Sequence, residues 1–190
     1  MRMNPKKEIK ILQKEDPRLR KISAEVDTFS IKSKKIKEII SSLKLAIDSQ
    51  SDAVAISAVQ IGELSRIFII SKKIFDILKE EKKPLKEAKK DLIFINPKIT
   101  KFSKAKVLCE EGCLSVRFLY GKVKRSTHVD IEAFDENGNK IERNASGLLA
   151  QIIQHENDHL DGILFIDKAI DIQEILPEKL KELQNEAGTY

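Results

Sequence analysis

Apolar residues recur at helical spacing between residues 30 and 50. They stand three or four positions apart, with lysines and serines between them, at Ile36, Ile39, Ile40, Leu43 and Ile47. Positions with this spacing share one face of a helix. The pattern therefore predicts an amphipathic helix that packs one face on the core.

A second stripe with the same spacing contains two histidines. It consists of Leu148, Ile152, His155 and His159. The steps of four, three and four predict a helix whose core-facing apolar stripe is continued by the two imidazoles. Asn144 or Ser146 is expected to cap the start of this helix, and Gly162 suits the position just past its end.

Shorter apolar runs predict strands. Residues 66–70 and 92–98 are almost continuously apolar, which is typical of buried strands, and Pro97 is expected to end the second one. Residues 122–143 predict paired strands, because residues 129–134 alternate and a hairpin turn signal follows at Asn137-Gly138.

Two further segments have patterns of their own. Residues 72–91 are rich in lysine with scattered apolar residues, which predicts a short helix and a solvated loop. Residues 170–186 carry isoleucines and leucines that predict a C-terminal helix. No internal repeat appears, and the 190 residues are expected to form a single domain with a full hydrophobic core.

Composition narrows the class of protein. The chain is 41% hydrophobic and 34% charged, as in a globular protein that is not embedded in a membrane. Its net charge of +5 favours an anionic partner only weakly, because aromatic residues make up just 5% and no arginine-and-aromatic cluster marks a DNA-binding face. No run approaches the roughly 20 apolar residues of a membrane span, and no signal peptide is recognisable. We expect a cytoplasmic protein with reduced thiols.

The histidine stripe carries a metal-binding pattern. His155-Glu156-Asn157-Asp158-His159 is a His-Glu-x-x-His motif, and two of the three histidines of the chain belong to it. On a helix both imidazoles reach one metal ion, and Glu156 can act as general base on a water at that ion. The alternative interpretation is a pair of core histidines bonded to the backbone, with Glu156 in solvent.

A catalytic metal needs a third protein ligand. Beyond Gly162 only Glu174 and Glu178 are available, and no motif surrounds them. Upstream, Glu110-Glu111-Gly112-Cys113-Leu114-Ser115 offers the thiol of Cys113. One thiolate and two imidazoles leave a fourth position open for water, as catalytic rather than structural zinc sites do. Cys113 is therefore the better candidate.

The sequence resembles the peptide deformylase family. That family has a glycine-rich segment ending in Gln-x-Gly, then Glu-Gly-Cys-Leu-Ser, then Gln-His-Glu-x-Asp-His. The second and third motifs match residues 111–115 and 154–159, and the resemblance runs from about Ile11 to Asp167. It implies an α+β fold in which small, mainly antiparallel sheets surround a central helix that carries the His-Glu-x-x-His motif.

The resemblance also implies a reaction. Such an enzyme would hold one divalent metal, Fe(II) in the cell and zinc, nickel or cobalt as alternatives, on Cys113, His155 and His159. Glu156 would be the general base, and the Gln60 amide with the Leu114 backbone N–H would hold the oxyanion. The substrate would be the N-terminal formylmethionine of a nascent polypeptide, and formate would be released. A transient ribosome contact is a further expectation.

The substrate pocket is expected around four residues. By resemblance these are Val54, Ala55, Leu148 and Ile152. The first motif departs from the family, because Ala53 and Ala55 replace glycines, and Arg117 stands where the family usually has proline. An alanine disfavours positive φ and narrows the approach of a ligand.

Two rival functions remain open from the sequence. The departures in the first motif and at Arg117 favour a deformylase-like metal hydrolase with weak or altered amide preference. The basic charge is the only support for a non-catalytic metal-binding or ribosome-associated protein. Poor turnover of formyl-methionyl peptides would favour the first rival over a deformylase. A Glu156→Gln variant with unchanged properties would favour the second rival.

Overall fold

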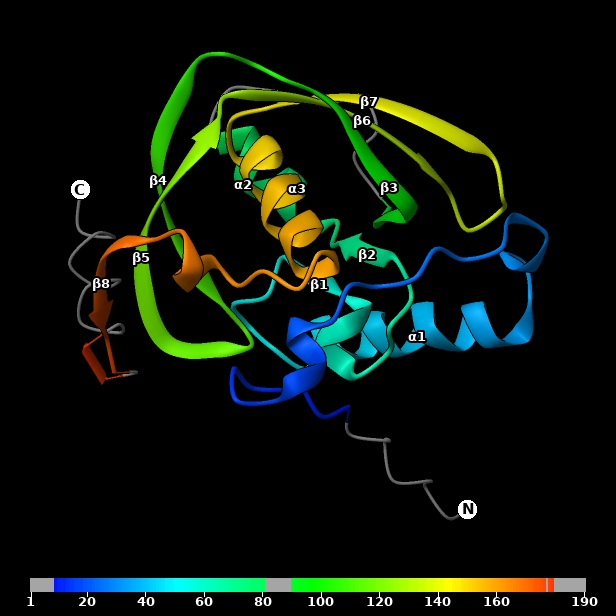
Figure 1. The fold of residues 1–190 in the computed structure, drawn as a ribbon, viewed down its shortest axis with the longest axis horizontal. Helices are drawn as coiled ribbons and strands as arrows, with labels where there is room; N and C mark the ends of the chain where they lie inside the picture. The colour runs from blue at the N-terminus through cyan, green and yellow to red at the C-terminus, as the bar shows by residue number, and fades with distance from the viewer. Residues whose placement is uncertain (1–8, 81–89, 177, 180–190) are drawn as a thin grey trace.

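Strands surround a central helix. The structure is a computed structural model that describes residues 9–80, 90–176 and 178–179. The helix, α3 (Gly147–Leu160), lies in the middle of the molecule with strands curving around it (Figure 1). The helical stripe of the sequence correctly predicted this helix, and Ser146 occupies its N-cap position without a side-chain hydrogen bond.

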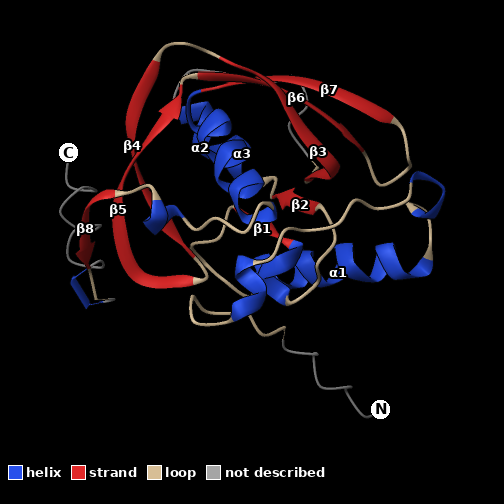
Figure 2. Cartoon of the chain, in the orientation of Figure 1, coloured by secondary structure: helices blue, strands red, loops and turns tan. Residues whose placement is uncertain are grey.

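Two antiparallel sheets are present in the described part of the chain (Figure 2). The larger sheet has the order β1 (Ala55–Ser57), β2 (Ile67–Ile70), β3 (Leu92–Phe102), β6 (His128–Phe134) and β7 (Lys140–Ser146). The smaller sheet has the order β4 (Lys106–Cys113), β5 (Val116–Ser126) and β8 (Ile170–Glu174). The predicted α+β class, with antiparallel sheets around a central helix, is confirmed.

Two other α-helices lie beside the sheet. The predicted amphipathic helix is α1 (Lys34–Asp48), and the hydroxyl of its N-cap Ser33 accepts a hydrogen bond from Ile36 N–H at 3.4 Å. The apolar stripe of α1 packs in one core cluster with residues of β2. Every residue of β2 is buried. The short helix expected in residues 72–91 is α2 (Lys73–Glu80), and the loop expected after it falls mostly outside the described residues.

Short 3-10 turns complete the described secondary structure. They are η1 (Pro17–Arg20), η2 (Thr28–Ser30), η3 (Ala58–Ile61) and η4 (Phe165–Asp167). No helix in the described part of the chain is long and apolar enough to span a bilayer.

The histidine stripe of α3 faces the core only in part. Leu149, Ile153 and Leu160 are buried in the cluster between α3 and the large sheet. Leu148 and His155, which were expected to face the core, are only half-buried and line a hollow at the surface. The helix therefore uses one face for packing and an adjacent face for the hollow.

Pro97 does not end its strand, contrary to the sequence prediction. β3 continues to Phe102 through a shift in register between Ile95 and Lys98. Asn96 occupies this irregularity with φ 52°, and its side chain donates to Val26 O and accepts from Val26 N, both at 2.7 Å. A strand tolerates proline at such a bulge, where no ladder hydrogen bond is needed.

The C-terminal helix prediction is wrong for its first residues. Residues 170–174 form β8, an exposed strand that pairs with the edge of β5. Ile170 and Ile172 alternate with polar residues, which is the period of a strand, and β5 offers backbone groups to pair. Residues 177 and 180–186 lie outside the described residues.

Candidate active site

The strand β4 and the helix α3 bring three possible metal-ligand atoms together. Cys113 ends β4, whereas His155 and His159 stand one turn apart on α3. Cys113 Sγ lies 3.1 Å from His159 Nε2, and one ligand atom from each of the three residues lies within 4.8 Å of the others. In a tetrahedral site the sulfur and nitrogen ligands of one ion are roughly 3.5 Å apart. The three side chains are therefore close to the spacing that a single metal ion requires.

The chemistry of the donor set fits a divalent metal. Among the described residues, the buried His159 Nδ1 and Glu156 Oε2 have no hydrogen-bond partner. Buried polar atoms nearly always have a partner, so the unpaired Glu156 oxygen, in the same hollow as Cys113 and His155, points to a site built for an ion and its ligands. Burial lowers the pKa of His159 well below its ordinary value. A neutral imidazole is the form that binds a metal.

A buried ion pair orients His155. Its Nδ1–H donates to Glu111 Oε2 at 2.9 Å, which leaves Nε2 to bind an ion. Arg125 donates twice to the Glu111 carboxylate, at 2.7 and 2.9 Å, and also to Asp158 at 2.6 Å. Burial opposes the charge of Glu111, yet the hydrogen bonds from Arg125 and His155 lower its pKa to about 2. The carboxylate is thus charged and fixed.

No sequence motif indicated the role of Arg125. Glu111 belonged to a recognised motif without an assigned role, and Arg125 is one of several basic residues in a predicted strand. A buried arginine that is 4% exposed needs an acidic partner, but its burial is not visible in the sequence.

Glu156 lies in the hollow with one oxygen unpaired. It is 3% exposed and lines the hollow beside His155. Burial raises its pKa to about 7, and the neighbouring His155 and the Ser57 hydroxyl oppose this rise. Because Glu156 is buried, the alternative interpretation of the motif, with Glu156 in solvent, is wrong.

Gln60 is held against the thiol. Its side-chain oxygen accepts from Ser57 N–H at 2.9 Å and from the Ser57 hydroxyl at 3.1 Å. Its amide nitrogen is thereby directed to Ser115 Oγ at 3.1 Å and to Cys113 Sγ at 3.6 Å. Such fixed amide donors suit a site where negative charge develops.

A hollow of about 760 Å³ lies beside Cys113, His155 and Glu156. The four residues expected to bind substrate line it, together with Gln60, Cys113, Leu114, His155 and Glu156. His159 lies buried beneath it, at 1% exposure. Phe118, Tyr120 and Gln151 also line the hollow, and Gln151 is tied to the Glu110 carbonyl at 2.8 Å. Volume and lining suit a cleft for a small apolar side chain on a peptide.

The alanines of the first motif fit their backbone. Ala55 is in β1 opposite Ile70, and Ala53 is buried. Of the described non-glycine residues, only Asn96, Phe118 and Asp171 have positive φ. Neither alanine therefore occupies a conformation that requires glycine.

Known proteins resemble this chain over most of its length. A family model described as polypeptide deformylase matches residues 9–174. The peptide deformylase of Psychrobacter cryohalolentis is 39% identical over 159 residues, which is 83% of this chain and 77% of the relative. That of Rhizobium meliloti is 36% identical over 154 residues, 80% of this chain and 79% of the relative.

Solved structures show the same likeness. A class I type b peptide deformylase from Acinetobacter baumannii has a TM-score of 0.73 and 28% identity, covering 84% of this chain and 97% of that chain. A probable peptide deformylase from Synechococcus phage S-SSM7 has a TM-score of 0.70 and 32% identity, covering 85% of this chain and 99% of that chain. The Acinetobacter baumannii enzyme has also been solved with bound Met-Ala-Ser.

Proposed function

The chain belongs to the polypeptide deformylase family and is a metal-dependent enzyme that removes the N-formyl group of new polypeptides, and from this premise we propose how its own residues act. Cys113, His155 and His159 hold one divalent metal. The single observation that carries this proposal is the convergence of their ligand atoms beside a buried glutamate. We propose Fe(II) in the cell, with zinc, nickel or cobalt accepted by the same donors.

A metal held by Cys113, His155 and His159 would act as a Lewis acid, lowering the pKa of a water toward neutrality and polarising the formyl oxygen. Glu156 then takes the proton of the attacking water on its unpaired Oε2, which faces no competing donor among the described residues. It returns that proton to the amine nitrogen as the C–N bond breaks, so that formate and a free N-terminus leave.

The oxyanion is held by groups that are fixed before the substrate binds. The Gln60 amide is anchored by Ser57 through two hydrogen bonds to its oxygen, so it does not have to reorganise during the reaction. The Leu114 backbone N–H follows the ligand Cys113 directly, and its carbonyl accepts from Gln13 at 3.1 Å. We assign both donors to the developing negative charge.

The methionine side chain enters the apolar part of the hollow. Leu148 and Ile152 on α3 line it together with Val54, and we place the substrate backbone beside Ala55 in β1. An unbranched thioether suits such an irregular apolar space.

The remaining properties are also proposals. Residues 1–190 form one domain, with residues 72–91 as an insertion relative to shorter deformylases. The enzyme works in the cytoplasm on nascent N-formylmethionyl chains and makes at most a transient contact with the ribosome. Cytoplasmic reducing conditions keep both free cysteines, Cys109 and Cys113, as thiols.

Formate release tests the proposal. The substrate is formyl-Met-Ala-Ser, the enzyme is purified without oxygen in the presence of iron or nickel, and acetyl-Met-Ala-Ser is the matched control peptide. We expect rapid formate release by the parent chain and a loss of at least about 100-fold in kcat for Glu156→Gln with the metal retained. Equal turnover by Glu156→Gln would contradict the role of Glu156.

A further inference from the structure

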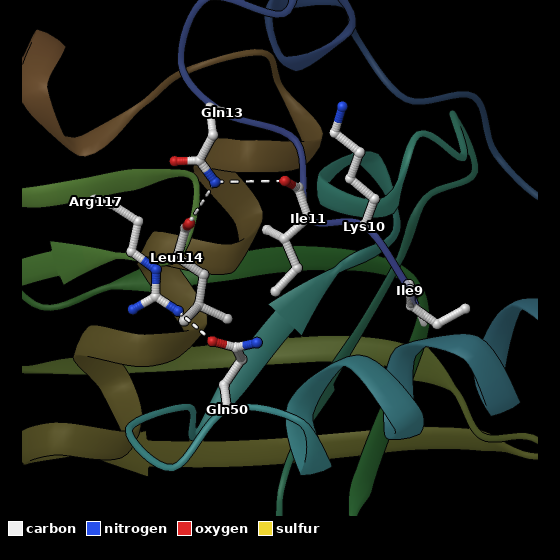
Figure 3. A pocket seen from close by; sticks show the side chains of 7 residues that line it. All are labelled: Ile9, Lys10, Ile11, Gln13, Gln50, Leu114 and Arg117. Atoms are coloured by element: carbon white, nitrogen blue, oxygen red, sulfur yellow. Dashed lines mark hydrogen bonds between the residues drawn. The ribbon is translucent and has the colours of Figure 1, made fainter. Parts of the chain in front are cut away.

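A second hollow adjoins the catalytic one. Its volume is about 440 Å³, and it is lined by residues of the N-terminal arm between Ile9 and Gln13, together with Gln50, Leu114 and Arg117. Figure 3 shows these side chains gathered around the hollow. Gln50, Leu114 and Arg117 also line the catalytic hollow, so they form the boundary between the two spaces.

Arg117 bridges this boundary. From the start of β5 its Nη1 donates to Asp52 Oδ2 at 2.8 Å, and its Nη2 donates to Gln50 Oε1 at 2.5 Å. Both acceptors belong to the segment that follows α1. The guanidinium and the amide point toward each other in Figure 3. The side chains of Arg117 and Asp52 are 30% and 48% exposed. Arg117 lines both hollows, whereas Asp52 lines the catalytic one.

The second hollow favours an anion. Two of its lining side chains, Lys10 and Arg117, are cationic, and no aspartate or glutamate lines it among the described residues. Gln13 and Gln50 add amide donors, whereas Ile9, Ile11 and Leu114 give an apolar floor. A polypeptide with a carboxylate side chain matches this combination of charge, amides and apolar surface.

We propose that Arg117 is a specificity-determining residue that selects an acidic side chain in the substrate, downstream of its formylmethionine. The polypeptide leaves the catalytic hollow across Leu114 and enters the second hollow. Its carboxylate then replaces Asp52 as the partner of the guanidinium. This exchange costs little free energy, because exposed ion pairs contribute little net stability. A planar guanidinium can also bind the incoming carboxylate through two parallel N–H donors. The inference rests on the proposed function, since it takes the catalytic hollow as the start of the peptide path.

Matched peptides test the selection. Formyl-Met-Ala-Ala-Ala is varied with glutamate or its isostere glutamine at the second, third or fourth residue, and kcat/KM is measured for each pair. We expect glutamate to exceed glutamine by roughly two- to fivefold at one position, the range of an exposed ion pair. Arg117→Gln should bring that ratio to one, Asp52→Asn should raise it, and added salt should lower it.

The control variant is Lys37→Gln, which removes one exposed positive charge on α1 and should leave the ratio unchanged. A second ratio compares affinities: the binding of glutamate and glutamine versions of the unformylated product peptides to the metal-loaded protein is measured. A binding ratio that depends on Arg117 supports this inference even if formyl peptides are not hydrolysed, and in that case the proposed function alone fails.

Three results would overturn the inference. The first is a ratio of one at every position for both turnover and binding. The second is a ratio that persists in Arg117→Gln. The third is a ratio of one accompanied by inhibition with a short RNA that Arg117→Gln abolishes, which would assign the hollow to a phosphate backbone.

Discussion

Arg125 offers a way to separate stability from metal binding. Its side chain is 4% exposed and makes charge-assisted hydrogen bonds to Glu111 and Asp158. Replacing it by methionine keeps most of its volume but leaves the Glu111 carboxylate, which is 2% exposed, without its main counter-charge. Asp158 is affected less, because Lys168 Nζ stays 2.7 Å from it.

The expected loss of folding stability in Arg125→Met is large. Breaking a buried ion pair on one side costs about 3–5 kcal/mol, because an uncompensated charge remains buried. For a chain of this length that loss lowers Tm by roughly 6–20 °C. Replacing both partners by apolar residues is often close to neutral, so Arg125→Met combined with Glu111→Leu should recover most of the lost stability. The double variant still lacks the acceptor for His155 Nδ1, and its metal affinity should fall by about 10- to 100-fold.

The assay is a double-mutant cycle on the metal-free proteins. Urea unfolding gives the free energy of unfolding for the parent, both single variants and the double variant, and metal titration gives the affinity of each. Glu111→Leu alone should cost less stability than Arg125→Met, because Arg125 retains its ion pair with Asp158 in that variant. Additive stability losses, or a double variant that binds metal as tightly as the parent, would refute the reasoning.

Four further predictions follow from the same structure. Gln60→Ala should lower kcat by roughly 10²–10³ with little change in KM, because an oxyanion donor acts mainly in the transition state; a change confined to KM would exclude that role. Removal of the metal with a chelator should abolish formate release, and readdition of nickel should restore it; activity that survives in metal-free protein would contradict a metal-dependent site. Asn96→Ala should cost about 1–3 kcal/mol in urea unfolding, since Val26 N–H and C=O both lose their partner; a change below about 0.5 kcal/mol would show that the bulge does not depend on this side chain. Ala55→Gly should leave kcat/KM for formyl-Met-Ala-Ser within about twofold, because Ala55 already has strand geometry; a large gain would show that the methyl group obstructs the substrate.

The sequence predicted those parts of the site that depend on local spacing. His155 and His159 are four residues apart on a helix, so their shared face follows from helix geometry alone. Cys113 and Gln60 were found through motifs, and the structure places them beside the histidines.

Long-range pairing explains what the sequence did not reveal. Arg125 meets Glu111 because β4 and β5 pair in one particular register, and no local pattern records that register. Both residues also bond to side chains of α3. The same limitation applies to β8, where isoleucines at 170 and 172 fit either a helix or a strand until the open edge of β5 is known. Pro97 misled the strand prediction because its bulge depends on Asn96 reaching Val26, a residue distant in sequence.

The most direct test of the central claim is the absorption spectrum of the protein loaded with Co(II). If Cys113, His155 and His159 are the ligands, the spectrum should show an intense thiolate-to-cobalt charge-transfer band and the strong visible bands of a tetrahedral ion, at one cobalt per chain. Cys113→Ser should abolish the charge-transfer band, whereas Cys109→Ser should leave it unchanged. A band that survives in Cys113→Ser, or cobalt bound without any thiolate band, would contradict the proposed metal site.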